Sequence, residues 1–260
     1  MADFVNKGSI VREIWGKADT ILFIFAGASA EFAVNKAVDW LYFTGKLPAD
    51  PLGRLFSTVA YARQIVFSEY DAANRSIDKI TAIHQDVEAK RGARIPDWAY
   101  RDVLFMLIDY SIRSFEVLER KLTADEKAEV FAVFYRVGTR MGINGLPHTF
   151  TTWEQMRQDH IQANLQPTHF SKDLYLQYRK HLGAARYYLL RQVQILVVPP
   201  HVNDLLSLGR VPFIAPVISF YKCARLMGLE KYIKNAILPP NYLTQIQSLD
   251  AQSKKEPLNV

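Results

Sequence analysis

The chain has 260 residues, 49% of them hydrophobic and 12% aromatic, so it can bury one sizeable core and is not disordered in composition. Its single cysteine, Cys223, excludes an intramolecular disulfide and gives no sign of an oxidising compartment. The formal net charge of +6 is concentrated in residues 167–240, which contain ten basic and three acidic residues.

Apolar residues at spacings of three and four predict helices through the first half of the chain. The strongest pattern lies on one stripe that begins at Tyr100 and ends at Leu118. Three earlier segments also have helical patterns: Asp19 to Phe43, Leu52 to Ser68 and Ala72 to Arg91. The start of the chain lacks the pattern of a secretory signal, and no apolar stretch is long enough to span a bilayer.

In the second half, capping patterns and prolines mark the helix boundaries. Thr123 with Glu126 and Thr151 with Glu154 each match a capping box, and Ser171 is the predicted cap of a helix running to Gln192. Prolines break the rest into shorter helices, and only Ile195 to Val198 has a plausible strand pattern. We therefore predict an all-α, single-domain bundle with globin-like packing around an apolar pocket (residues 1–249), followed by a mobile tail (residues 250–260).

Several enzyme classes lack their minimal motifs in this sequence. A phosphate-binding loop and a dinucleotide-binding GxGxxG are both missing, and Gly27 to Glu31 lacks the second glycine of a nucleophile elbow. None of the six histidines follows a glutamate by three residues, and no HExxH or CxxC occurs, which disfavours di-iron and zinc chemistry.

The basic region has tyrosines interleaved with its charges, which leaves three partners open: nucleic acid, an anionic membrane surface, or the propionates of a buried cofactor. Because no nucleic-acid motif accompanies the charge, we expect no nucleic-acid partner. A solvated basic face is the simplest interpretation, and peripheral contact with an anionic membrane stays open.

His84 is the histidine best placed for chemistry. On a helix it shares one face with Ile77, Ile80, Val87 and Arg91, which turns the imidazole toward aliphatic neighbours. A buried neutral imidazole can ligate iron through one nitrogen. From spacing alone, a core histidine bonded to a backbone carbonyl is the more common alternative. For the other histidines we favour structural or surface roles: His148, His160, His169, His181 and His201.

An ordered set of motifs extends over residues 21–155. An apolar helix rich in small residues, ILFIFAGASAEFAV, comes first; Asp50-Pro51 then leads into Arg54-Leu55-Phe56-Ser57-Thr58; and His84 is followed by Val87 and Gly92. A long helix, the Thr123/Glu126 pair, Gly142-Ile143 and Leu146-Pro147 complete the set. In this order the chain resembles the catalytic domain of the rubber oxygenase and MpaB-type oxygenase family.

The resemblance implies haem b as the cofactor, with His84 as the iron ligand and with Arg54 and Thr58 on the oxygen-binding side. Arg54, Ser57 and Thr58 lie within about one helical turn, so all three can face one pocket. There a guanidinium and a hydroxyl would stabilise negative charge that develops on dioxygen. The implied reaction oxidises or cleaves a carbon–carbon double bond of a hydrophobic, terpenoid-like small molecule, with O2 as the second substrate.

The sequence also departs from the family pattern. Ser57 stands where the rubber oxygenase has a lysine, and Thr81 and Glu88 stand where it has arginines beside the iron-binding histidine. The propionate contacts must then come from Arg91 or from the basic C-terminal third. No general base is singled out, since Glu31 and Asp39 are equally compatible with paired or pore-facing carboxylates.

These departures support a second hypothesis on the same fold. It is a haem-free helical protein that binds a lipid or polyketide, or an enzyme that works without a cofactor in an apolar pocket. Because no secretory signal is visible, we expect a cytoplasmic protein acting on intracellular small molecules. The sequence leaves its oligomeric state open.

Overall fold

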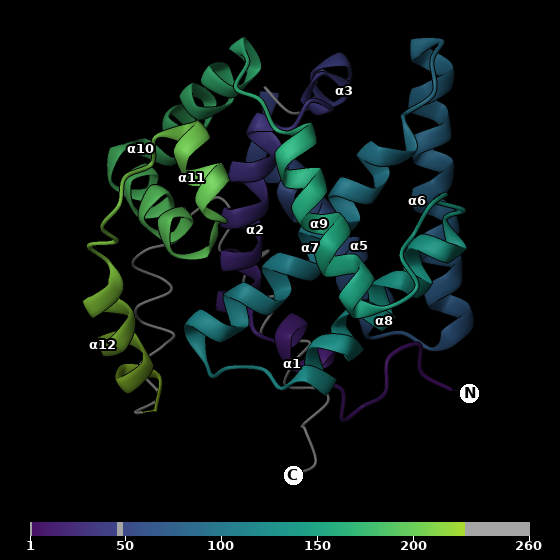
Figure 1. Cartoon of the computed structure of the whole chain (residues 1–260), viewed down its shortest axis with the longest axis horizontal. Helices are drawn as coiled ribbons and strands as arrows, with labels where there is room; N and C mark the ends of the chain where they lie inside the picture. Colours follow the sequence, from purple (N-terminus) through teal and green to yellow (C-terminus); the bar gives the residue numbers. More distant parts are fainter. Residues whose placement is uncertain (1, 46–48, 227–260) are drawn as a thin grey trace.

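The computed structural model describes residues 2–45 and 49–226, and this part of the chain is built from helices (Figure 1). Their bounds are α1 Ile10–Gly16, α2 Ala18–Val34, α3 Val38–Phe43, α5 Pro51–Val66, α6 Tyr70–Arg91, α7 Asp97–Leu118, α8 Ala124–Arg140, α9 Phe150–Asn164, α10 His169–Val197, α11 Pro200–Leu206 and α12 Ala215–Leu226. Within the described residues only two isolated β-bridges occur, so the predicted all-α class is confirmed.

Helix α2 is the centre of the bundle because it is apolar almost all the way round. It packs against α7 on one side and against α10 on another. The contact with α7 is closest at Gly27, where a Cβ atom would lie 2.2 Å from Cδ1 of Tyr110. A glycine at this position is what lets the aromatic ring of α7 lie directly on the α2 backbone.

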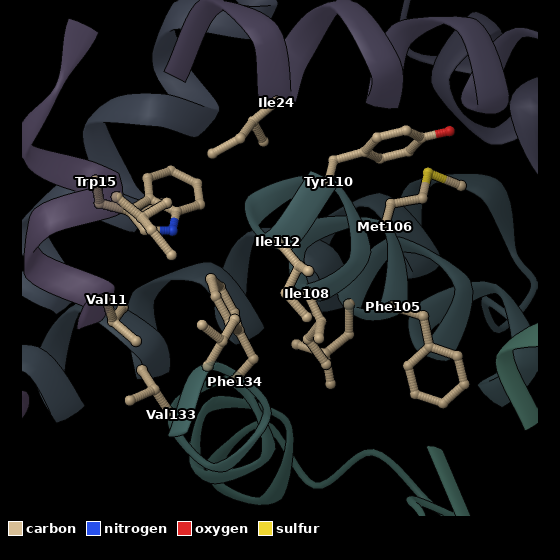
Figure 2. Packing of buried hydrophobic residues seen from close by; sticks show 14 of the residues in the cluster. Val11, Trp15, Ile24, Phe105, Met106, Ile108, Tyr110, Ile112, Val133 and Phe134 are labelled. Carbon is tan, nitrogen blue, oxygen red and sulfur yellow. The ribbon is translucent and has the colours of Figure 1, made fainter. Parts of the chain in front are cut away.

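The main core joins α1, α2, α7 and α8, and Figure 2 shows its large side chains meeting between these helices. The fully buried Trp15 packs edge-on against Phe25 and against the tilted ring of Phe134. Its indole Nε1 donates to Ser111 Oγ at 3.2 Å, so the one polar atom of this ring is satisfied inside the core.

The helix predicted from Asp19 to Phe43 is in fact two helices, α2 and α3, with the break at Asn35. The Asn35 Oδ1 accepts from the backbone N–H of Ala37 at 2.8 Å, and its Nδ2 donates to Asp102 Oδ2 at 2.8 Å. A short amide side chain that bonds its own backbone competes with the helical hydrogen bonds, which explains the break.

The capping residues confirm the predicted start of α8 and correct the predicted start of α9. Thr123 and Glu126 form the predicted capping box at the start of α8. The next box is formed by Thr149 and Thr152, two residues before the predicted pair. The prediction was wrong because Thr149 is the residue with extended backbone, and this conformation defines the cap.

Helix α10 differs from its prediction at both ends. Its cap is Thr168, with Ser171 at the third helical position, and the helix continues to Val197, so the segment Ile195 to Val198 is not a strand. Inside α10, Gly183 has φ 74° and ψ 169°, which interrupts the helix. A side-chain-bearing residue rarely adopts this conformation.

Among residues 2–45 and 49–226, no helix combines the length and apolarity needed to cross a membrane. The predicted tail, residues 250–260, lies outside the described residues, as do Pro239 and Pro240, the last of the prolines in the predicted run of shorter helices. The division at Leu249 stays a prediction.

Candidate functional site

A cavity of about 330 Å³ lies between α2, α5, α6, α7 and α8, with further lining from α3 and α10. The described side chains around it are apolar or aromatic apart from Ser29, Thr58 and His84. This volume falls at the lower end of small-molecule sites, which span roughly 300 to 1,000 Å³. Such an apolar chamber suits a lipophilic ligand, and its few polar side chains can fix the orientation of that ligand.

His84 lines this cavity from the middle of α6. Ile77, two turns earlier on the same face, is buried, and Ile80, one turn earlier, is half-buried, as the helical spacing predicts. The ring of Tyr100 from α7 meets the His84 ring edge-on, with 5.3 Å between centroids. The imidazole is therefore held at the wall of an apolar chamber by an aromatic neighbour.

Glu88 holds Tyr100, the aromatic neighbour of His84, by a hydrogen bond. Its Oε1 accepts from the Tyr100 hydroxyl at 3.1 Å and from the backbone N–H of Ile95 at 2.8 Å. Burial, followed by the nearby Glu88 charge, raises the pKa of Tyr100 well above its ordinary range, so the hydroxyl stays a donor. Glu88 is not among the described side chains that line the cavity, and its carboxylate fixes the start of α7 against α6.

Arg91, a predicted cofactor contact, lies about two turns beyond His84 and connects α6 to α3. Its Nη2 donates to Asp39 Oδ2 at 2.7 Å, and its guanidinium carbon lies 3.9 Å from the centre of the Trp40 ring. Trp40 is a lining residue, so Arg91 supports the rim of the cavity from behind this indole. Asp39 is the paired carboxylate, one of the two alternatives considered for it.

Of the three α5 residues predicted to share a pocket, the structure places one, Thr58, at the cavity. Thr58 lines the cavity together with Tyr61 from the same helix, whereas Ser57 is half-buried and is not among the described lining residues. Arg54 lies one turn before Thr58 on α5, but its side chain is outside the described part of the structure. The structure thus brings Thr58 and His84 to the same chamber.

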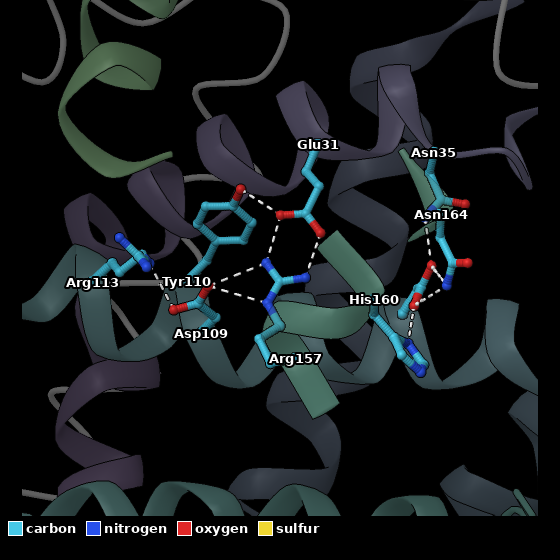
Figure 3. Close-up of polar contacts among 9 residues, drawn as sticks. Glu31, Asn35, Asp109, Tyr110, Arg113, Arg157, His160 and Asn164 are labelled. Carbon is cyan, nitrogen blue, oxygen red and sulfur yellow. Dashed lines mark hydrogen bonds and ion pairs between the residues drawn. The ribbon is translucent and has the colours of Figure 1, made fainter. Parts of the chain in front are cut away.

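The predictions from sequence did not include the buried ionic network between α2, α7 and α9 (Figure 3). Arg157 donates through Nη1 and Nη2 to the two carboxylate oxygens of Glu31, at 2.5 Å each, and through Nε to Asp109 Oδ2 at 3.2 Å. The Tyr110 hydroxyl donates to Glu31 Oε2 at 2.8 Å. Burial alone would lower the pKa of Arg157, but the charges of Glu31 and Asp109 outweigh it, so the pKa is raised.

A second polar group lies beside this network, also visible in Figure 3. Asp102 accepts from Asn35, Asn164 and Nδ1 of His160, which gives His160 a structural role, one of the two alternatives considered for it. None of these residues is among the described ones that line the cavity. Both groups therefore hold helices together and are not part of the chamber.

One sequence signal could have revealed the network. Arg157 lies midway between Trp153 and Ile161 at spacings of four, so it occupies an apolar face of α9. An arginine in the middle of such a face must be buried, and a buried arginine requires carboxylate partners.

Comparison with known proteins gives the family. The family model for the catalytic domain of ER-bound oxygenase mpaB/B′ and rubber oxygenase matches residues 15–227. The chain belongs to this family. The match includes every described residue that lines the cavity, from Phe25 to Tyr178, so the chamber lies inside the MpaB/rubber oxygenase catalytic domain.

Membership in the MpaB/rubber oxygenase family confirms the predicted resemblance and assigns the chain to a family of oxygenases. No curated relative matches the chain. Among the described residues, no group of three or more histidine, cysteine, aspartate or glutamate side chains is arranged to hold a bare metal ion. A porphyrin-bound iron needs only one protein ligand, because the porphyrin supplies four nitrogens.

Proposed function

We propose that this chain is a haem b-dependent oxygenase that oxidises or cleaves a carbon–carbon double bond in a hydrophobic, terpenoid-like small molecule. The observation that carries the proposal is the position of His84, whose imidazole lines an apolar cavity inside an oxygenase catalytic domain. Imidazole is the common protein ligand of haem iron, and the apolar walls match both a porphyrin face and a lipophilic alkene.

The side chains around His84 suit the coordination of a haem iron. His84 would hold the iron, and the Tyr100 ring, tied to Glu88, would fix the orientation of the imidazole. When bound, haem would supply the iron centre at which dioxygen is activated.

Side chains of the protein would stabilise the developing charge, exclude water and bind the substrate. The Thr58 hydroxyl would donate a hydrogen bond to negative charge that develops in the chamber, and Arg54, one turn earlier on α5, is the proposed second donor. The apolar walls would exclude water and bind the hydrocarbon part of the substrate. Ser57, next to Thr58 on α5, and Arg91, whose guanidinium stacks on the lining Trp40, are the proposed residues that flank the cofactor site.

The proposal is tested by titrating the purified protein with haem and following its Soret band. We expect a saturable band at an equimolar ratio, and in His84→Ala a shift of the band together with at least about tenfold weaker binding, because the axial ligand is lost. The control is His181→Ala, which removes an exposed histidine from α10 and should leave the titration unchanged.

If haem fails to bind, or if His84→Ala binds it with the same spectrum and affinity as the parent protein, the proposal is wrong. Far-ultraviolet circular dichroism of both variants would show whether the helices are retained, so that loss of binding is not confused with unfolding.

A second function is favoured by one specific observation. Among the described side chains that line the cavity there is no lysine or arginine to pair with propionates. A haem-free protein that binds a lipid or polyketide in this chamber, with or without catalysis, is therefore the alternative. It predicts no Soret band and an increase in the melting temperature when a lipophilic ligand is added.

A further inference from the structure

The last described helix presents apolar side chains to solvent. Phe213 is 69% exposed and Phe220 70%, with Val211 at 59% and Val217 at 54%. All four fall within ten residues, on the loop before α12 and on its first two turns. Large apolar side chains that cluster in this way on a surface mark a contact site more often than single exposed residues do.

The opposite face of α12 is already packed on the bundle. Ile214 is buried in a cluster with Ala26 of α2 and Val193 of α10, and Ile218 packs against the same cluster. One turn later, the Tyr221 hydroxyl donates to Asp19 Oδ2 at 3.0 Å. The helix is therefore fixed to the protein by one apolar face while its other apolar face remains uncovered, and a helix apolar on both faces needs a second apolar contact.

The charges within this segment of the sequence are all basic. Residues 205–229 include Arg210, Lys222 and Arg225 but no aspartate or glutamate. Arg210 is exposed and Lys222 half-exposed, so cationic groups lie at both ends of the apolar face. Aromatic side chains between basic ones match the layers of an anionic bilayer, whose apolar interior lies beneath negatively charged headgroups.

We propose that α12 and the loop before it dock on the surface of an anionic bilayer. Phe213, Val217 and Phe220 enter the headgroup region, and Arg210 and Lys222 pair with lipid phosphates and carboxylates. In Figure 1, α12 lies at the edge of the molecule on the side opposite α6. The binding does not depend on haem, so it stands or falls separately from the proposed oxygenase activity.

The test is co-sedimentation of the full chain with phosphatidylcholine vesicles that contain or lack phosphatidylserine. We expect binding only to the vesicles with phosphatidylserine, and weaker binding as salt is added. The double variant Phe213→Ser with Phe220→Ser should bind roughly tenfold or more weakly, because two aromatic rings no longer leave water. Replacing Arg210 and Lys222 by glutamine should lower the affinity about fivefold for each charge removed.

The matched control is Tyr70→Ser, which removes an exposed aromatic residue at the start of α6, at the other end of the molecule. It should bind vesicles like the parent protein. Equal vesicle binding by the phenylalanine double variant, or no binding by the parent protein, overturns the proposal. A parent protein that is dimeric and becomes monomeric in the double variant, without binding vesicles, would identify a second copy as the occupant and also overturn it.

Discussion

At the scale of single residues, Gly27 sets how closely α2 and α7 approach. The Tyr110 ring that lies over it cannot move aside easily, because its hydroxyl is bonded to the buried Glu31. The methyl group added by Gly27→Ala would overlap with the atoms of this ring. We expect a loss of about 1–3 kcal/mol in the free energy of unfolding, measured by urea denaturation.

Gly8→Ala is the control for this substitution, since no atom lies within 4 Å of the Cβ that it would add. It should change the free energy of unfolding by less than about 0.5 kcal/mol. If the two variants unfold at the same urea concentration, the close contact at Gly27 does not limit the packing of α2 on α7.

The residue scale also shows what spacing along one helix can and cannot predict. His84 was expected on an apolar face of its helix, and the structure places it at the cavity wall, because the facing of a helical residue depends only on its neighbours three and four positions away. The partners of Arg157 could not be predicted in this way. Glu31 is 126 positions away in sequence, and only the folded bundle brings α9 and α2 close enough for this contact.

At the scale of one element, the start of α8 combines a cap with an ion pair. Glu126 accepts from the backbone N–H of Thr123 at 2.8 Å and from both terminal nitrogens of Arg120 at 2.6 and 2.8 Å. The hydrogen bonds from Arg120, more than those from Thr123, lower the pKa of this carboxyl from 4.5 to about 2. The ionised form is therefore the one that stabilises the helix start.

Glu126→Gln keeps a capping-box side chain and removes only the charge. Because the folded pKa lies below the ordinary value, the stabilisation is complete above about pH 5 and is lost as the pH falls toward 2. We expect the variant to melt roughly 2 °C lower at neutral pH, with a difference that shrinks between about pH 5 and pH 2.

Asp125→Asn serves as its control, since it removes the same charge from the same turn and tests the general attraction to the helix dipole. A melting temperature lowered as much by Asp125→Asn as by Glu126→Gln would mean that the specific contacts of Glu126 add nothing.

Element boundaries were the least predictable part of the fold. The box at Thr123 was predicted because both of its partners are local in sequence. The break at Asn35 was missed because this residue lies in an otherwise continuous apolar helix pattern. Its side chain is held by Asp102 of another helix, and this contact appears only when α2 and α7 are packed together.

At the scale of the whole molecule, the network around Arg157 connects three helices that are distant in sequence. Arg157→Met would leave the buried Glu31 without its cation and Asp109 with Arg113 as its remaining cation. We expect a loss of about 3–5 kcal/mol in the free energy of unfolding, a large part of the stability of a typical domain, measured by chemical denaturation.

Arg140→Met is the matched control. It removes an arginine that also forms two hydrogen bonds to one carboxylate, that of Asp78, but does so in solvent. The denaturation midpoint should hardly change, because water and salt screen an exposed pair. If Arg157→Met unfolds at the midpoint of the parent protein, the network does not hold the helices together.

The all-α class could be predicted because each helix has its own local pattern of apolar residues and caps. The chamber could not, since its wall combines side chains from seven helices whose arrangement is a property of the packed chain. The family resemblance supplied the expectation of a pocket beside His84, and the positions of Thr58, Tyr100 and Trp40 around it come from the structure alone.

The interruption of α10 at Gly183 separates two tasks that one helix would otherwise share. Leu174 and Tyr178, before Gly183, form part of the chamber wall. Val193, after Gly183, packs in the cluster that buries Ile214. Because the hydrogen-bond ladder is broken at one glycine, the two halves can run in different directions, so one segment of the chain both lines the chamber and supports the residues that lead into α12.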